Sequence, residues 1–227
     1  ETFSNLWWNT ILACSFIILG SINIGFNLSE NKKFFFGKAI GLILFVNFLC
    51  FHLYQMNLGI WNVSYSLPLH LCGLSSILSF VVFFFKRQWI YELLFYWGIP
   101  GAFHSLMTPE FTVGMDGFLF YEYYISHGGI LLSALYFTFV LSFKPREGSW
   151  WRIFLRSQVL ILIVGASNWI LGANYMYFSR KPIVENPFLI GDWPWDIFYI
   201  DLFAMVHFLL IYIPFKIKFY NNKPSEV

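Results

Sequence analysis

Apolar residues run along this chain in long blocks that are separated by short polar stretches. Seven blocks are long enough to cross the hydrocarbon core of a bilayer, which takes about 20 residues of helix. They lie at 6–26, 34–56, 67–85, 89–106, 119–143, 151–177 and 196–216. The blocks are continuous and do not alternate with period two, which argues against a transmembrane β-barrel. The pattern predicts an all-α, polytopic membrane protein with seven transmembrane helices in one domain, residues 1–227.

Composition and charge support this class and add an orientation. Of 227 residues, 58% are hydrophobic and 11% are charged, whereas soluble domains carry about 25% charged residues. Twelve of the 14 basic residues lie in or beside the three odd-to-even loops and the C-terminal tail: Lys32, Lys33, Lys38, Lys86, Arg87, Lys144, Arg146, Arg152, Arg156, Lys216, Lys218 and Lys223. Since basic residues favour the cytoplasmic side, the N-terminus is expected outside and the C-terminus in the cytoplasm. No basic stripe interleaves with exposed aromatic residues, so no nucleic-acid partner is expected.

Polar and ionisable residues within the predicted helices gather in the outer half of the bilayer. They are His52, His70, His104, His127, Cys50, Cys72, Glu122, Asn174, Asp196 and Asp201, with His207 near the middle. Such groups are costly in a membrane and usually face a cavity or a partner. The distribution predicts a polar pocket that opens to the extracytoplasmic leaflet.

The stretch SLPLHLCGLSS at 66–76 carries the most reactive candidate. Pro68 suits the first turn of a helix because it lacks a backbone N–H, and Ser66 can cap that helix. Cys72 then falls in the first two turns, where the positive end of the helix dipole favours a thiolate. His70 lies two residues away and points to another face of the helix. A base from another helix is therefore needed, and His127 lies at matching depth.

Helix-breaking and small residues accompany the other histidines. Gly98, Pro100 and Gly101 interrupt the fourth block just before His104, which indicates a kink that lines a cavity. Gly128 and Gly129 follow His127 and remove side chains there, so a substrate or another backbone can approach. In the sixth block Asn168, Gly172 and Tyr175 recur at helical spacing and are expected on one face.

Several classes of function fit these residues. Cys72 and a histidine can perform covalent catalysis on a lipid, with Glu122, Asp201 or a tyrosine orienting the imidazole. Five histidines and several carboxylates also allow a metal-dependent lipid hydrolase, although no histidines lie at i, i+3 or i, i+4 spacing. A transporter or receptor could use the same groups to bind a ligand or relay protons. A purely structural role, or a disulfide between Cys50 and Cys72, also stays open.

Five short motifs in order resemble a known family. They are LPLHLC at 67–72, WGIPGAFHSLMTPE at 97–110, SHGG at 126–129, NYMYFSRKP at 174–182 and GDWPWD at 191–196. Together they resemble the bacterial YwaF-type integral membrane proteins, which are grouped with transmembrane protein 164 of animals. The resemblance extends from the first predicted helix to the seventh. More distantly, the chain is similar to the androgen-induced hydrolases of fatty-acid esters, which use a threonine and a histidine.

The resemblance implies a multi-pass protein of the bacterial cytoplasmic membrane and a cysteine-dependent acyltransferase that moves a fatty acyl chain between phospholipids. Carried over to this sequence, Cys72 would be the nucleophile that forms an acyl-thioester, and His127 would be its base and later its acid. His70 remains a rival for the base. The partner is then a phospholipid or another acyl lipid, and no cofactor or metal is expected. The residues expected to bind the ligand are His70, His104, Glu122, Asn168, Asn174, Tyr175, Asp201 and His207.

Overall fold

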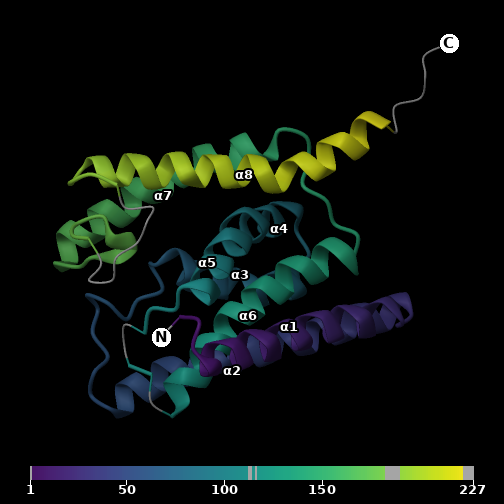
Figure 1. The fold of residues 1–227 in the computed structure, drawn as a ribbon, viewed down its shortest axis with the longest axis horizontal. Helices are drawn as coiled ribbons and strands as arrows, with labels where there is room; N and C mark the ends of the chain where they lie inside the picture. The colour runs from purple at the N-terminus through teal and green to yellow at the C-terminus, as the bar shows by residue number, and fades with distance from the viewer. Residues whose placement is uncertain (1, 112–113, 116, 182–189, 222–227) are drawn as a thin grey trace. The chain divides into compact units, whose positions relative to one another are not determined.

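The structure, a computed structural model, describes residues 2–111, 114–115, 117–181 and 190–221, and it contains no strand within them (Figure 1). Its elements are α1 (Asn5–Phe26), α2 (Glu30–Asn57), α3 (Leu71–Phe85), α4 (Gln88–Leu93), the π-helical segment η1 (Leu94–Gly98), α5 (Ile99–Met107), α6 (Phe118–Phe139), α7 (Ser149–Leu171), the 3₁₀ segment η2 (Tyr175–Tyr177) and α8 (Trp195–Asn221). The predicted all-α class is confirmed. Each of the seven apolar blocks overlaps a helix or an unbroken run of helical segments, since α4, η1 and α5 follow one another without a gap.

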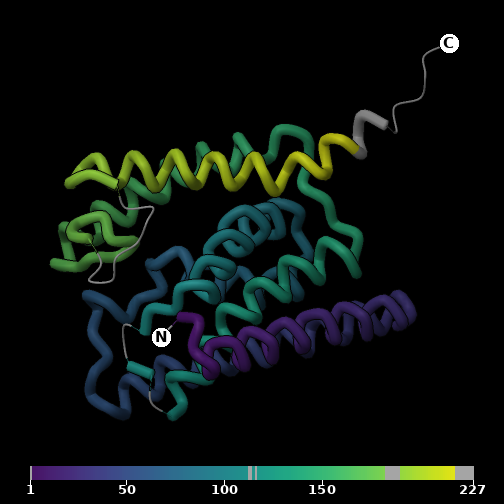
Figure 2. The backbone as a smooth tube through the Cα atoms, in the orientation of Figure 1, coloured from purple at the N-terminus to yellow at the C-terminus, as the bar shows by residue number. Residues whose placement is uncertain are grey.

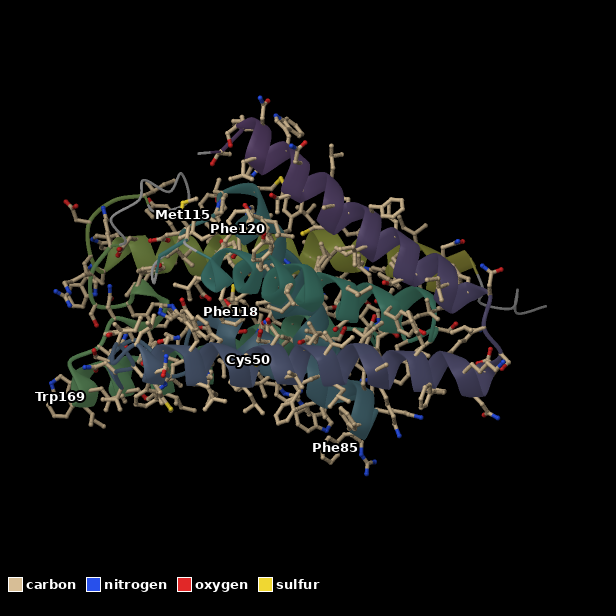
Figure 3. The ribbon with its side chains drawn as sticks, turned by 90° about the horizontal axis from the view of Figure 1, so that it is seen from below. Cys50, Phe85, Met115, Phe118, Phe120 and Trp169 are labelled. Carbon is tan, nitrogen blue, oxygen red and sulfur yellow. The ribbon has the colours of Figure 1, made fainter. Side chains whose placement is uncertain are left out.

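Four helices among the described residues are long and apolar enough to cross a membrane: Asn5–Phe26, Glu30–Asn57, Ser149–Leu171 and Trp195–Ile217. These helices leave large apolar side chains exposed in the isolated chain. Phe16 is 80% exposed on α1, and Trp169, labelled in Figure 3, is 87% exposed on α7. Apolar faces of this extent are stable only when something apolar covers them. The chain is therefore a multi-pass integral membrane protein.

The helices form two compact units, residues 1–143 and 144–227. Within the first unit α6 is the central helix, because it contacts α1, α2, α3, α5 and η1. Figure 3 shows α1 and α2 diverging from the turn that joins them, with α6 in the gap between them. Glycines permit this close packing, since Gly25 of α1 lies against Tyr136 of α6 and Gly129 of α6 lies against Leu44 of α2.

The run from α4 to α5 is irregular rather than broken. All five residues of η1 are buried, and Pro100 follows within the first turn of α5. The sequence predicted an interruption at Gly98–Gly101, and the structure instead keeps the run helical by widening one turn. Single π turns of this kind often occur at functional sites.

A long connection joins α2 to α3 (Figure 2). Residues at the end of α2 hold it in place through hydrogen bonds. The carbonyl of Gln55 accepts hydrogen bonds from the backbone N–H groups of Ile60 and Trp61. The Gln55 side-chain oxygen accepts a further bond, 2.7 Å long, from the hydroxyl of Ser66. Because Gln55 is only 1% exposed, this buried amide fixes the path of the chain that leads into α3.

In the second unit the sixth block departs from its predicted boundary. The sequence predicted helix to residue 177, but α7 ends at Leu171 and Gly172 adopts the left-handed conformation just after it (φ 60°). Glycine is the residue that takes this conformation without steric cost, so it ends helices in this way. The prediction that Asn168, Gly172 and Tyr175 share one helical face was therefore wrong, because the chain turns between them.

Candidate functional site

The first turn of α3 carries Cys72. The helix begins at Leu71 with His70 at the N-cap position. Since Pro68 had been expected in the first turn, the helix starts three residues later than this proline. A tight turn between Leu67 and Leu69 precedes it, closed by a 2.7 Å backbone bond. A Cβ on Gly73 would lie 2.9 Å from the Cα of Pro68, so the glycine lets the incoming chain fold against the helix. The later start places Cys72 closer to the end of the helix dipole than predicted.

Two polar side chains from other helices meet the sulfur of Cys72. The imidazole of His127, on α6, lies near the thiol and interacts with it electrostatically. The hydroxyl oxygen of Ser105, on α5, lies 3.5 Å from the Sγ atom. Gly101, one turn earlier on α5, also faces the sulfur, because a Cβ there would lie 3.8 Å from Sγ. Three helices of the first unit thus converge on one thiol.

The orientation of His127 is set by its own helix. Its Nδ1 lies 2.7 Å from the carbonyl oxygen of Tyr123, which can only accept a hydrogen bond, so Nδ1 carries the proton. The nitrogen left for Cys72 is then Nε2, which accepts a proton in the neutral imidazole. The Tyr123 ring packs on the imidazole with 4.2 Å between ring centroids. The carbonyl and the ring of one tyrosine therefore fix both the tautomer and the plane of His127.

The hydroxyl of Tyr123 extends this support to α5. It donates a 2.9 Å hydrogen bond to the carbonyl oxygen of Ser105 and accepts a 3.3 Å bond from the backbone N–H of Glu110. Tyr123 accordingly ties together the helix that carries His127 and the helix that carries Ser105.

A carboxylate lies beside this cluster. Glu122 is 9% exposed and accepts a 3.4 Å bond from the side-chain amide of Asn47, on α2. It also interacts electrostatically with His127 and lies near Ser126. The hydroxyls of Ser126 and Ser76 lie 2.8 Å apart, which links this group to α3. The carboxyl group of Glu122 lies near His127, while the direct orienting contact comes from the Tyr123 carbonyl.

Two further predicted residues lie close to this cluster along the chain. His70 occupies the N-cap position of α3, two residues before Cys72. His104 lies in the last turn of α5, and the next residue, Ser105, makes the contact with the sulfur. Of the two roles that the sequence allowed for the glycine pair, the structure shows the approach of other helices: Leu44 of α2 packs against Gly129, and a Cβ on Gly128 would lie 3.7 Å from the Cys14 sulfur of α1. These glycines accommodate neighbouring helices.

The predicted binding residues of the second unit form hydrogen bonds within the turn that follows α7 and between α7 and α8. Asn168 is 3% exposed and spans the turn after α7: its amide donates to the Tyr175 carbonyl at 2.9 Å, and its oxygen accepts from the Tyr175 N–H at 2.7 Å. Asn174 accepts bonds from the backbone N–H groups of Ser179 and Arg180. The amide of Gln158, on α7, donates to both oxygens of Asp201, on α8, at 2.9 and 3.1 Å. His207 bonds the carbonyl of Phe203 through Nδ1.

Neither a disulfide nor a metal-ligand group occurs in the described part of the chain. Cys14, Cys50 and Cys72 are free thiols, so the Cys50–Cys72 disulfide that the sequence left open is not formed. No three His, Cys, Asp or Glu side chains that could hold a metal ion lie together among the described residues.

Two parts of the cluster were not predicted from the sequence. Ser105 was not expected as a partner of the thiol, and the Tyr123 carbonyl was missed because a main-chain acceptor leaves no signal in the residue type.

The fold and this cluster define a multi-pass helical membrane protein with a thiol, an imidazole and a hydroxyl gathered where α3, α5 and α6 meet. Residues 2–212 match the model of the TMEM164 family, and the chain belongs to that family. An uncharacterized protein of Treponema pallidum (strain Nichols) is 25% identical over 159 residues, which are 66% of this chain and 62% of that protein. This chain thus covers less than two thirds of the curated relative. No solved structure shows significant similarity.

Proposed function

We propose that this protein is a lipid acyltransferase, or an acyl-ester hydrolase, that uses Cys72 as nucleophile and His127 as base. The observation that carries the proposal is the 2.7 Å contact that fixes the tautomer of His127, because this imidazole lies near the Cys72 thiol and interacts with it electrostatically. A positioned imidazole beside a thiol is the arrangement that nucleophilic catalysis requires. The contact favours His127 over His70 as the base.

The first half of the reaction would load the enzyme. Nε2 of His127 takes the thiol proton, and the thiolate attacks the ester carbonyl of a phospholipid. The tetrahedral intermediate collapses by breaking the carbon–oxygen bond to glycerol, and the imidazolium returns its proton to the departing lysophospholipid oxygen. An acyl-thioester on Cys72 and a lysophospholipid result.

The second half would unload it. His127 removes a proton from the hydroxyl of an acceptor lipid, or from water, and that oxygen attacks the thioester carbonyl. The carbon–sulfur bond breaks, and the sulfur regains its proton from the imidazolium. A lipid acceptor makes the protein a transferase and water makes it a hydrolase. Stabilisation of the negative oxygen in each intermediate would come from donors at the start of α3.

The membrane setting supports the substrate class. Ester groups of phospholipids lie just below the headgroups, which matches the depth expected for a cysteine in the first turn of a membrane helix. We further propose seven membrane crossings with the N-terminus outside, which places the cluster in the outer leaflet by the positive-inside rule. The bacterial relative is in line with a bacterial cytoplasmic membrane as the location.

Intact-mass spectrometry of the purified protein, after incubation with phosphatidylcholine vesicles, tests the proposal. Wild type is expected to gain the mass of a fatty acyl group, and hydroxylamine should remove it. Cys72→Ser and His127→Ala should lack the adduct, whereas Cys50→Ser, which changes an exposed thiol, should keep it. Absence of any adduct in wild type, with Cys72 freely alkylated, would favour a non-catalytic transporter or receptor.

A further inference from the structure

The side of the Cys72 sulfur that faces α5 carries a hydroxyl and little else. Ser105 Oγ lies 3.5 Å from Sγ, and Gly101, one turn earlier, presents no side chain. We propose that Ser105 is a catalytic residue whose hydroxyl donates a hydrogen bond to the sulfur and stabilises the thiolate. The use of that thiolate as a nucleophile rests on the proposed function. The contact between Ser105 and the sulfur does not.

The direction of this hydrogen bond follows from counting protons. Nδ1 of His127 donates to the Tyr123 carbonyl, so Nε2 of the neutral ring has a lone pair to offer. The thiol has one proton, and the proposed function pairs that proton with Nε2. If the thiol instead donated to Ser105, the lone pairs of sulfur and Nε2 would face each other. The sulfur is therefore the acceptor toward Ser105, and the hydroxyl is the donor.

Ionisation of the thiol strengthens this bond. The S–H bond breaks and an N–H bond forms at Nε2, while Ser105 keeps its own proton and remains bonded to sulfur. Hydrogen bonds to an ionised acceptor are roughly twice as strong as neutral ones. Ser105 thus stabilises the thiolate more than the thiol, both when the nucleophile forms and when sulfur leaves the thioester.

The position of Ser105 is itself supported. Its carbonyl accepts the 2.9 Å bond from the Tyr123 hydroxyl, and the same tyrosine orients His127. Tyr123 therefore positions both the imidazole that would take the proton, His127, and the residue that would stabilise the thiolate, Ser105. This arrangement suits a group that must keep its geometry while charge appears on sulfur.

Alkylation of Cys72 by iodoacetamide tests the proposal without any lipid. The full-length protein in detergent would be labelled at neutral pH, and the rate at each cysteine would be followed by peptide mass spectrometry. Only the thiolate reacts, and one hydrogen bond to a charged group changes its population about tenfold or more. Ser105→Ala should therefore slow alkylation of Cys72 about tenfold, with the exposed Cys50 as the internal reference.

Variants at the same position separate the hydroxyl from packing. Ser105→Thr retains the hydroxyl and should label at close to the wild-type rate, whereas Ser105→Gly should be as slow as Ser105→Ala. The proposal is overturned if Ser105→Ala labels at the wild-type rate, or if Ser105→Thr is as slow as Ser105→Ala. Slower labelling in Ser105→Ala, with no acyl adduct in wild type, would uphold Ser105 and reject acyl transfer.

Discussion

The two units of this chain use polar side chains in different ways. In the second unit, Asn168 pairs its donor and its acceptor with one backbone segment, and both oxygens of Asp201 are bonded by Gln158. In the first unit, Cys72, Ser105 and His127 come from three helices and meet at a sulfur. Polar groups that satisfy the backbone hold a turn, whereas a thiol, an imidazole and a hydroxyl that lie close together suit the proposed chemistry. The comparison separates positions that should affect stability from those that should affect reactivity.

The largest expected effect is on reactivity in the first unit. His127→Asn removes the proton acceptor from Cys72 and should slow formation of the acyl adduct by at least about 100-fold, as is usual for loss of a general base. Time-resolved intact-mass spectrometry would measure it. The matched control is His52→Asn, because His52 lies on α2 and accepts a bond from the Trp61 indole. An equal loss in both variants would show that any histidine change merely disturbs folding.

The next effect is on stability in the second unit. Asn168→Ala removes the side-chain oxygen that accepts from the buried Tyr175 N–H and one of the donors to the Tyr175 carbonyl, which should cost about 1–3 kcal/mol. Thermal unfolding in detergent should show a lower midpoint. Ser167→Ala, which removes only an exposed hydroxyl bonded within the helix, should leave the midpoint nearly unchanged. If Asn168→Ala unfolds like wild type and fails instead to bind lipid, then Asn168 belongs to a ligand site after all.

A third prediction contrasts two adjacent glycines. A Cβ at position 129 would overlap the Leu44 side chain, with Cγ only 3.2 Å away, so Gly129→Ala should destabilise the first unit by about 1–3 kcal/mol through overpacking. Gly128→Ala would place its Cβ at an ordinary 3.7 Å from the Cys14 sulfur and should be tolerated. Thermal unfolding of both variants decides the matter, and equal midpoints would contradict the packing of α6 on α2.

The smallest expected effect comes from a single hydroxyl. Tyr123→Phe keeps the ring and the carbonyl that orient His127, and it removes the bond to the Ser105 carbonyl together with the bond from the Glu110 N–H. Loss of the bond to Ser105, worth about 0.5–1.5 kcal/mol, should slow adduct formation roughly 2- to 10-fold. Tyr124→Phe, which changes the neighbouring buried tyrosine, serves as the control. Rates that agree within error for all three proteins would show that Tyr123 does not position α5.

Much of the helical architecture was accessible from the sequence because long apolar blocks allow few alternatives. The depth of residues along those blocks also pointed to His127 as a partner of Cys72, and this pairing stays a prediction. Helix ends were less accessible. The late start of α3 depends on the close approach of Pro68 to Gly73, and the early end of α7 depends on Gly172.

The remaining parts of the site depend on groups that residue types do not display. The Tyr123 carbonyl that fixes the His127 tautomer belongs to the main chain, and any residue at position 123 would offer one. Asn168 and Tyr175 did have a pattern, but spacing alone could not distinguish a shared helical face from a bond across a turn. A ligand-binding role for them therefore remains a prediction.

The π-helical segment at Leu94–Gly98 also determines which residues reach the thiol. A wider turn holds one more residue than an α-helical turn, and in an α-helix each residue advances the direction of the side chains by ~100°. Everything after residue 98 is therefore rotated relative to an uninterrupted helix, and Gly101 and Ser105 face Cys72 in that rotated register. In evolutionary terms, an insertion or deletion of one residue within this buried turn would rotate α5. A neighbour of Ser105 would then face the sulfur, without any substitution in α5 itself.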